Sequence, residues 1–376
     1  MTAGRGERIG VLMINFGEPT DLSLPAIVPF LERIFLRNAG LEERGDAGRA
    51  RARELAEARA PALLEEYLEI GGSPLNHQAA QHARALHASL SASGIDAAVA
   101  QGFQFTRPFI LDALAELREA GVEHLVALPI YPLCGYSTTV AALDDVREGL
   151  AALGWGVEWT AISGWHHHPD YIELRARAIR RYCHAHDLDP TDDDTLLYFS
   201  AHGTPVKYLV EGSRYDRYVH EHCAAVADAV GTDRWTVGFQ NHTNRRIAWT
   251  RPDNEDRIAE LSERHLVVDA ISFMHEQSET LSELDDELKA FTEGLGKHFH
   301  RVPVPHDDPA FPEFLRTVVD AALDRPGTEG SFLSPCRCRS ARGTFCTNGA
   351  RDLPASPWGG DAFRVADGQA GDGRAG

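Results

Sequence analysis

Short apolar runs rich in β-branched residues alternate with amphipathic helical patterns along most of this 376-residue chain. Alternation of this kind is typical of a parallel β-sheet whose strands are joined by crossover helices. The pattern therefore predicts an α/β fold. The expected strands are residues 9–16, 97–103, 124–130, 156–161, 195–201, 236–240, 266–273 and 298–302. The expected helices between them are residues 25–37, 78–91, 108–119, 171–184, 215–230 and 311–323.

The eight expected strands fall into two sets of four, separated by a break near residues 157–169. We expect two Rossmann-like lobes, at residues 1–157 and 158–325, each built on a four-stranded parallel sheet flanked by helices. A stretch rich in Arg, Glu and Ala at residues 46–66 is expected to form an exposed helix. This helix would be a lip over a cleft between the lobes.

Beyond residue 325 the chain becomes rich in Gly, Pro, Ser, Asp and Arg and poor in large apolar side chains. Such a composition buries too little apolar surface to fold by itself. We expect residues 326–353 to form a separate segment that contains cysteines, and residues 354–376 to be disordered.

The formal net charge of −19 argues against a nucleic-acid partner, because binding to phosphates requires clustered positive charge. No run of apolar residues reaches the length of a membrane span, and the first one, residues 9–16, is too short for the core of a signal peptide. We expect a cytoplasmic protein with no integral membrane segment. Its six cysteines then indicate metal ligation or buried thiols rather than disulfides. The oligomeric state stays open.

Two segments place reactive side chains at the ends of expected strands. His202 follows one apolar run, while Glu279, Glu283 and Glu287 follow another at intervals of four residues. The interval puts the three carboxylates on one helical face, and open α/β sheets bind ligands at the carboxyl ends of their strands. Taken alone, a histidine at a strand end or acidic residues in a first helical turn are more often structural. Their common location favours a site that binds a divalent cation and moves protons.

Five segments carry a family resemblance in their order and spacing. They are residues 12–19, residues 67–76, residues 128–132 with 137–139, and the histidine and glutamate segments at 199–205 and 275–287. Over residues 8–325 the chain resembles the ferrochelatases, enzymes that insert ferrous iron into a porphyrin. The resemblance implies a metal chelatase of haem biosynthesis whose substrates are Fe²⁺ and protoporphyrin IX or coproporphyrin III.

The resemblance also assigns roles to individual residues. It implies that His202 lies at the porphyrin centre as metal ligand or proton acceptor, that Glu279 is the essential carboxylate and metal ligand, and that Glu283 continues an acidic track. Residues expected to bind the substrate are Phe16, Gly71, Gly72, Ser73, Gln104, Trp249, His275 and Gln277.

Three of these residues differ from the family pattern. Many members have a tyrosine or methionine at the position of Phe16, an arginine at that of Gln104 and a histidine at that of Gln277. His275 lies two residues before Gln277 and could substitute in part for the missing histidine. The differences leave two alternatives open. One is an enzyme on the same scaffold that acts on another tetrapyrrole, another metal or a non-porphyrin ligand. The other is a tetrapyrrole-binding sensor without turnover.

The last cysteines form a cluster, with Cys336, Cys338 and Cys346 inside eleven residues. Some ferrochelatases hold a [2Fe-2S] cluster through three C-terminal cysteines and one from the first lobe, and Cys134 lies in the matching loop. The resemblance therefore implies a [2Fe-2S] cofactor. Structural zinc is the main alternative, because four thiolates suit both metals, and a tail without metal is the third. Cys183 and Cys223 lie in amphipathic patterns and are expected to be buried.

Overall fold

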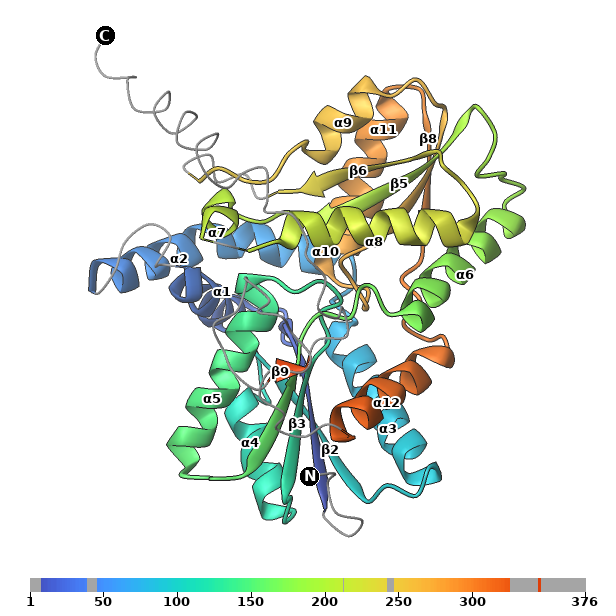
Figure 1. The fold of residues 1–376 in the computed structure, drawn as a ribbon. Helices are drawn as coiled ribbons and strands as arrows, with labels where there is room; N and C mark the ends of the chain where they lie inside the picture. Colours follow the sequence, from blue (N-terminus) through green and yellow to red (C-terminus); the bar gives the residue numbers. More distant parts are fainter. Residues whose placement is uncertain (1–7, 39–45, 212, 242–246, 325–343, 346–376) are drawn as a thin grey trace.

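The computed structural model describes residues 8–38, 46–211, 213–241, 247–324 and 344–345. These residues form two lobes, each a parallel sheet with helices on both faces (Figure 1). The expected α/β fold with two parallel sheets is confirmed. A lipid bilayer needs about 20 apolar residues in a row, and no helix within the described parts of the chain provides such a stretch.

The first sheet lies in the lower half of Figure 1. Its strands are all parallel and have the order β2 (Ala97–Phe103), β1 (Ile9–Asn15), β3 (His124–Pro129), β4 (Glu158–Ile162) and β9 (Thr344–Phe345). Alternate residues of β1 face opposite layers, as the two-residue period of a strand requires. Val11 and Met13 pack toward α3 (Leu75–Ala92) and α12 (Ala310–Leu323), and Leu12 and Ile14 toward α4 (Ile110–Glu119) and α5 (Ala141–Leu153).

The second sheet repeats this order with β6 (Trp235–Gln240), β5 (Thr195–His202), β7 (His265–Ala270) and β8 (His298–Val302). Helices α6 (Pro169–Ala185) and α8 (Tyr215–Val230) cover one face. On the other face lie α9 (Asn254–Glu260), the π-helical turn η3 (Glu283–Leu288) and α11 (Lys289–Gly294). The short helices α7 (Val206–Val210) and α10 (Ser278–Leu281) follow β5 and β7, and the π-helical turn η2 (Tyr136–Val140) precedes α5.

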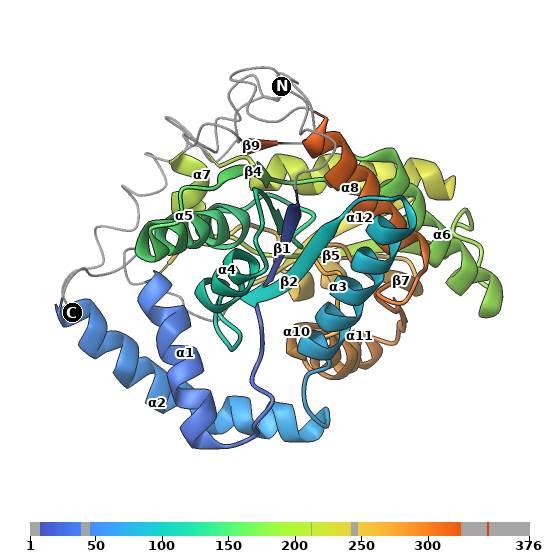
Figure 2. The same cartoon turned by 90° about the horizontal axis from the view of Figure 1, so that it is seen from below.

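One helix lies in a different lobe from the one expected, and the expected boundary between the lobes cuts one strand off from the first sheet. β4 pairs with β3 in the first sheet, so the expected boundary at 157–158 would separate it from its neighbour. Helix α12 packs beside α3 on the first sheet, although we expected residues 158–325 to form the second lobe (Figure 2). The apolar period of α12 indicates a buried helical face, but it does not say which sheet that face covers.

Helix α1 (Leu24–Asn38) packs against α2 (Asp46–Glu69), and both extend to one side of the first sheet (Figure 1). Their contact is apolar, with Ile27, Phe30 and Tyr67 buried in it. The exposed helix expected at residues 46–66 is thus α2, which buries one side against α1.

Candidate active site

The strand order places a topological switch point in the second sheet. The connection from β5 leads to β6 on one side, while β7 lies on the other side of β5. Ligands of open α/β sheets bind at such points, beyond the carboxyl ends of the strands. His202 ends β5, and the segment that carries Glu279 and Glu283 follows β7.

His202 and Glu279 form a direct pair at this point. The Nε2 atom of His202 lies 3.0 Å from Oε1 of Glu279, and their side chains are 29% and 23% exposed. The other ring nitrogen, Nδ1, lies 2.6 Å from the carbonyl oxygen of Gly203, to which only an N–H can donate. Nδ1 therefore carries a proton, and Nε2 is the atom that exchanges one with its surroundings.

The main chain around His202 is fixed by neighbouring groups. Tyr215 donates its hydroxyl to the carbonyl oxygen of His202 (2.9 Å), and the His202 amide donates to Ser272 Oγ (2.9 Å). At Gly203 a Cβ atom would lie 1.7 Å from Asn241 Oδ1, so this close approach requires glycine. The imidazole thus projects from a backbone with little freedom to move.

The charges of this group depend on one another. Burial acts to lower the pKa of His202, but the Glu279 carboxylate outweighs it and raises the pKa to about 9. Burial, and then repulsion from Glu279, raise the pKa of Glu283 to about 7, although Gln240 Nε2 donates to its Oε2 atom at 2.6 Å. Near neutral pH the three side chains can therefore exchange protons among themselves.

Two glutamines brace the carboxylates. Gln277 Nε2 donates to Oε2 of Glu279, and the Gln277 amide donates to Thr280 Oγ1 (2.9 Å) at the start of α10. Gln240 donates both to Glu283 and to the main-chain oxygen of Glu279 (2.8 Å). Gln277 thus holds the carboxylate that faces His202.

Phe16 and Gln104 lie together at the carboxyl ends of β1 and β2. The amide of Phe105 donates to the Phe16 carbonyl oxygen (3.1 Å), and the two phenyl rings have centroids 4.5 Å apart. Gln104 accepts a hydrogen bond from the hydroxyl of Tyr131 (2.5 Å). These two residues therefore hold corresponding strand-end positions in the first lobe.

Gly71, Gly72 and Ser73 form the turn that ends α2. Both glycines have positive φ, +75° and +92°, and a Cβ atom at Gly71 would meet nothing within 4 Å. Glycine is required here by the backbone conformation rather than by crowding. Ser73 donates its hydroxyl to the carboxylate of Glu18.

Trp249 and His275 have different surroundings. Trp249 forms an isolated antiparallel bridge with Pro205, three residues after His202, so the structure brings it near the candidate site. His275 is buried at 4% exposure, with its Nε2 atom 3.1 Å from Nδ1 of His82 on α3. Its ring therefore contributes to the contact between the lobes, and burial lowers its pKa well below the usual value.

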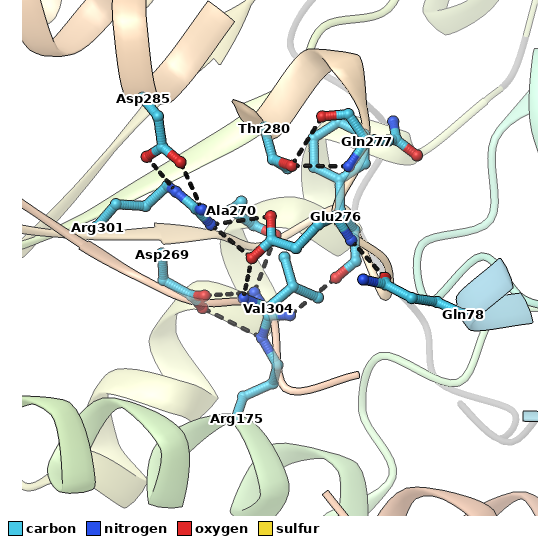
Figure 3. A network of polar contacts seen from close by, with 11 residues as sticks. Gln78, Arg175, Asp269, Ala270, Glu276, Gln277, Thr280, Asp285, Arg301 and Val304 are labelled. Atoms are coloured by element: carbon cyan, nitrogen blue, oxygen red, sulfur yellow. Dashed lines mark hydrogen bonds and ion pairs between the residues drawn. The ribbon is translucent and has the colours of Figure 1, made fainter. Parts of the chain in front are cut away.

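A network of charged side chains supports the segment that carries the carboxylates (Figure 3). Buried Arg175 on α6 bonds to Asp269 and donates to the carbonyl oxygens of Ala270 and Phe273, each at 2.9 Å. These contacts fix the turn at the end of β7.

The second half of the network lies around Arg301 on β8, which binds Glu276 (2.9 Å) and Asp285 (2.6 Å). Gln78 of α3 accepts from the Glu276 amide at 2.9 Å. Sequence reasoning missed these residues, and the one available signal was a charge, Asp269, inside an apolar strand.

Among the described residues, no three His, Cys, Asp or Glu side chains are arranged to hold a metal ion together. His202 and Glu279 by themselves therefore offer an incoming ferrous ion one imidazole nitrogen and one carboxylate. Cys134, Cys183 and Cys223 are buried, which confirms the expectation for the last two. Cys336, Cys338 and Cys346 lie outside the described residues.

The sequence matches the family model described as Ferrochelatase over residues 8–323. A ferrochelatase of Picosynechococcus sp. is 32% identical over 342 residues, covering 87% of this chain and 86% of that protein. One of Nostoc punctiforme is 31% identical over 338 residues, covering 85% and 83%. The match to the structure of the sirohydrochlorin chelatase SirB of Bacillus subtilis covers 84% of this chain and 95% of SirB. Its TM-score of 0.46 and its sequence identity of 9% are too low to bear on fold or function. The resemblance is thus confirmed, and the chain belongs to the ferrochelatase family.

Proposed function

We propose that this protein is a metal chelatase that inserts ferrous iron into a porphyrin in haem biosynthesis. The contact of His202 with Glu279 at the switch point of the second sheet is the observation that carries the proposal. Membership of the ferrochelatase family supports the class of reaction. The partly exposed pair, with Glu283 behind it, suits a reaction that releases protons next to a metal.

The reaction joins Fe²⁺ to a porphyrin that carries two pyrrole N–H groups, and it releases two protons. With a pKa of about 9 the imidazole is protonated near neutral pH, so we assign the role of proton acceptor to the Nε2 atom of His202 after it has passed its own proton to Glu279. From there a proton passes to Glu279, 3.0 Å away, and on to Glu283, which shares protons near neutral pH because its pKa is raised to about 7. The negative charge of the carboxylates also attracts the ferrous ion.

We assign the macrocycle to the space between the strand ends of the two lobes. Phe16 lacks a donor atom and so contacts the ring through its apolar surface, as we also propose for Trp249. Gln104 offers its amide to a polar substituent in place of an arginine charge. The turn of Gly71, Gly72 and Ser73 borders the substrate, and Gln277 acts through Glu279.

The test is an anaerobic metallation assay that follows loss of free-porphyrin fluorescence when ferrous iron is added. Protoporphyrin IX and coproporphyrin III are compared side by side. We expect turnover with one of them, and we expect H202A to lower kcat by about 10²- to 10⁴-fold, the range typical of a lost general acid–base group. H77A, which changes an exposed histidine on α3, is the matched control. A protein that metallates neither porphyrin, or an H202A variant that is fully active, would contradict the proposal.

We further propose that Cys134, Cys336, Cys338 and Cys346 hold a [2Fe-2S] cluster and that residues 326–353 are the cluster-binding segment. Cys346 directly follows β9, whose Phe345 pairs with Ile162 at the end of β4.

The loop after β4 bonds in turn to the loop of Cys134, because the amide of Trp165 donates to the Pro132 carbonyl oxygen (3.0 Å). Four thiolates and two sulfides outweigh the charge of two irons and leave net negative charge, which the arginines at 337, 339 and 342 can balance. A cytoplasmic location belongs to the same proposal, since the cysteines must stay reduced.

Anaerobic purification tests this proposal. Protein with the cluster should be coloured and contain about two irons per chain. C134S should lose the colour, whereas C183S, which changes a thiol buried between α6 and α8, should keep it. One zinc per chain, or full iron content in C134S, would contradict the assignment.

A further inference from the structure

Glu18 is a buried carboxylate close to the candidate active site. It follows β1 and is 4% exposed, and its two oxygens accept hydrogen bonds from three hydroxyls: Tyr67 of α2 (2.9 Å), Ser73 of the following turn, and Ser278 of α10 (2.5 Å). The Ser278 amide also points at Oε2, at 3.4 Å. One side chain thus joins β1, α2, the turn after α2 and α10.

These contacts cross between the two lobes. Glu18, Tyr67 and Ser73 belong to the first lobe, whereas Ser278 begins the helix that carries Glu279 in the second. The main chain of Glu18 is fixed as well, because Asn76 accepts from its amide (3.0 Å) and donates to its carbonyl oxygen (2.8 Å). The Glu18 carboxylate is therefore a fixed point of the first lobe to which α10 is attached.

Burying a carboxyl group is unfavourable, and the donors to Glu18 offset this only in part. Burial raises the pKa of Glu18, while the hydroxyls of Ser278, Ser73 and Tyr67 act in the opposite direction. All three side-chain donors are neutral hydroxyls rather than a cationic partner. An apolar residue of similar volume would avoid this cost but could not accept the hydrogen bond of Ser278, so the carboxyl serves to hold the hydroxyls that converge on it.

We propose that Glu18 is a positioning residue, which holds Ser278 so that the next residue, Glu279, faces His202. This inference rests on the proposed function, in which Glu279 takes part in proton transfer. A second contact from the first lobe acts in the same way, since Gln78 accepts from the Glu276 amide at 2.9 Å. The residues before and after Gln277, Glu276 and Ser278, are thus both bonded to the first lobe. Within the second lobe, Arg301 also binds Glu276 (Figure 3).

Ser278→Ala and Glu18→Gln test this role, because each removes the contact while leaving little change in volume. We expect kcat to fall about 10-fold or more, as small displacements of a catalytic group cause, while KM for the porphyrin changes little. The kcat of the double variant E18Q/S278A should be no lower than that of the less active single variant, because both changes remove the same contact. Amide exchange should increase in peptides covering residues 276–288 and nowhere else.

The chain offers a matched control in Ser89→Ala. Ser89 of α3 donates to Glu313 of α12 at 2.7 Å, a serine–carboxylate contact between distant segments on the first sheet. In this variant, kcat and the rate of amide exchange in residues 276–288 should be the same as in the unaltered protein. Unchanged kcat in both S278A and E18Q would overturn the inference, as would exchange that increases throughout the first lobe together with a raised KM. If the unaltered protein metallates neither porphyrin, the proposed function fails, and the exchange experiment alone then decides whether Glu18 positions this segment.

Discussion

The Nε2 atom of His202 lies 3.0 Å from Oε1 of Glu279, so an imidazole at the end of β5 meets a carboxylate that follows β7. These two strands are neighbours in the second sheet, and the residues beyond their carboxyl ends come together although they are far apart in the chain. The contact makes the charge of each side chain depend on the other.

Replacing Glu279 by Gln should lower the pKa of the His202 imidazole toward its usual value. The carboxylate is the main group that raises the pKa of His202 to about 9, and a neutral amide of similar shape cannot do so. We expect the pKa of His202 in E279Q to fall toward 6.5 in an NMR titration of the imidazole signals. E287Q, which changes an exposed carboxylate further along η3, is the control. An unchanged titration in E279Q would show that another group raises the pKa.

Replacing Gln240 by Leu should move the acidic limb of the rate profile. The Gln240 amide opposes the effect of burial on Glu283, so its loss should raise the pKa of Glu283 above about 7. If Glu283 must be ionised to accept a proton, kcat/KM in Q240L will begin to fall at a higher pH than in the unaltered protein. The pH dependence of kcat/KM measures this, with Q81L on the exposed side of α3 as control. A shift toward lower pH would contradict the assignment.

The sequence predicted the elements of the sheets well because their local patterns are strong. β2 and β8 have the predicted bounds, and β1 ends one residue early at Asn15. The fifth strand of the first sheet, Thr344–Phe345, was not predicted, because two residues are too few to show the alternating pattern of a strand. The position of α12 was missed because an apolar face is compatible with either sheet.

The candidate site was predicted only in part, for a similar reason. His202 and Glu279 lie at strand ends, where the fold itself predicts ligands. The four-residue spacing predicted one regular helical face, but after Ser282 the chain enters a π-helical turn in which the Glu287 amide donates to the Ser282 carbonyl oxygen (3.1 Å). Glu18 between Gly17 and Pro19 has the local pattern of an ordinary turn. Its partners are distant in sequence, so only the folded chain reveals its role.

Removing Arg175 should destabilise the fold strongly. Arg175 and Asp269 are each 1% exposed, and R175M would leave the Asp269 carboxylate buried without its cation. The expected loss is about 3–5 kcal/mol in the free energy of unfolding, measured by urea denaturation. The double variant R175M/D269L should recover part of this loss, because no buried charge remains. R53M, at the exposed Arg53–Glu57 pair, should change stability little, and an equal effect of R53M and R175M would contradict the argument.

The His82–His275 contact between the lobes should make the protein sensitive to acid. Burial lowers the pKa of His82 to about 4, although its hydrogen bond to the His306 carbonyl oxygen opposes this, whereas the unfolded chain binds the proton near pH 6.5. Above pH 6.5 the ring is neutral in both states. As the pH falls from about 6.5 to about 4, the unfolded state gains a proton that the folded state excludes. For this group the free energy of unfolding then decreases by up to about 1.4 kcal/mol per pH unit.

Replacing His82 by Gln should reduce that slope, because glutamine does not titrate. Urea denaturation of H82Q at a series of pH values between 7 and 4 measures the slope directly, whatever the stability of the variant at pH 7. H87Q is the matched control, since His87 lies on the exposed side of the same helix and is hydrated in both states. His275 remains in H82Q, and burial lowers its pKa as well, so part of the slope should persist. A slope as steep in H82Q as in H87Q would place the acid sensitivity elsewhere than at His82.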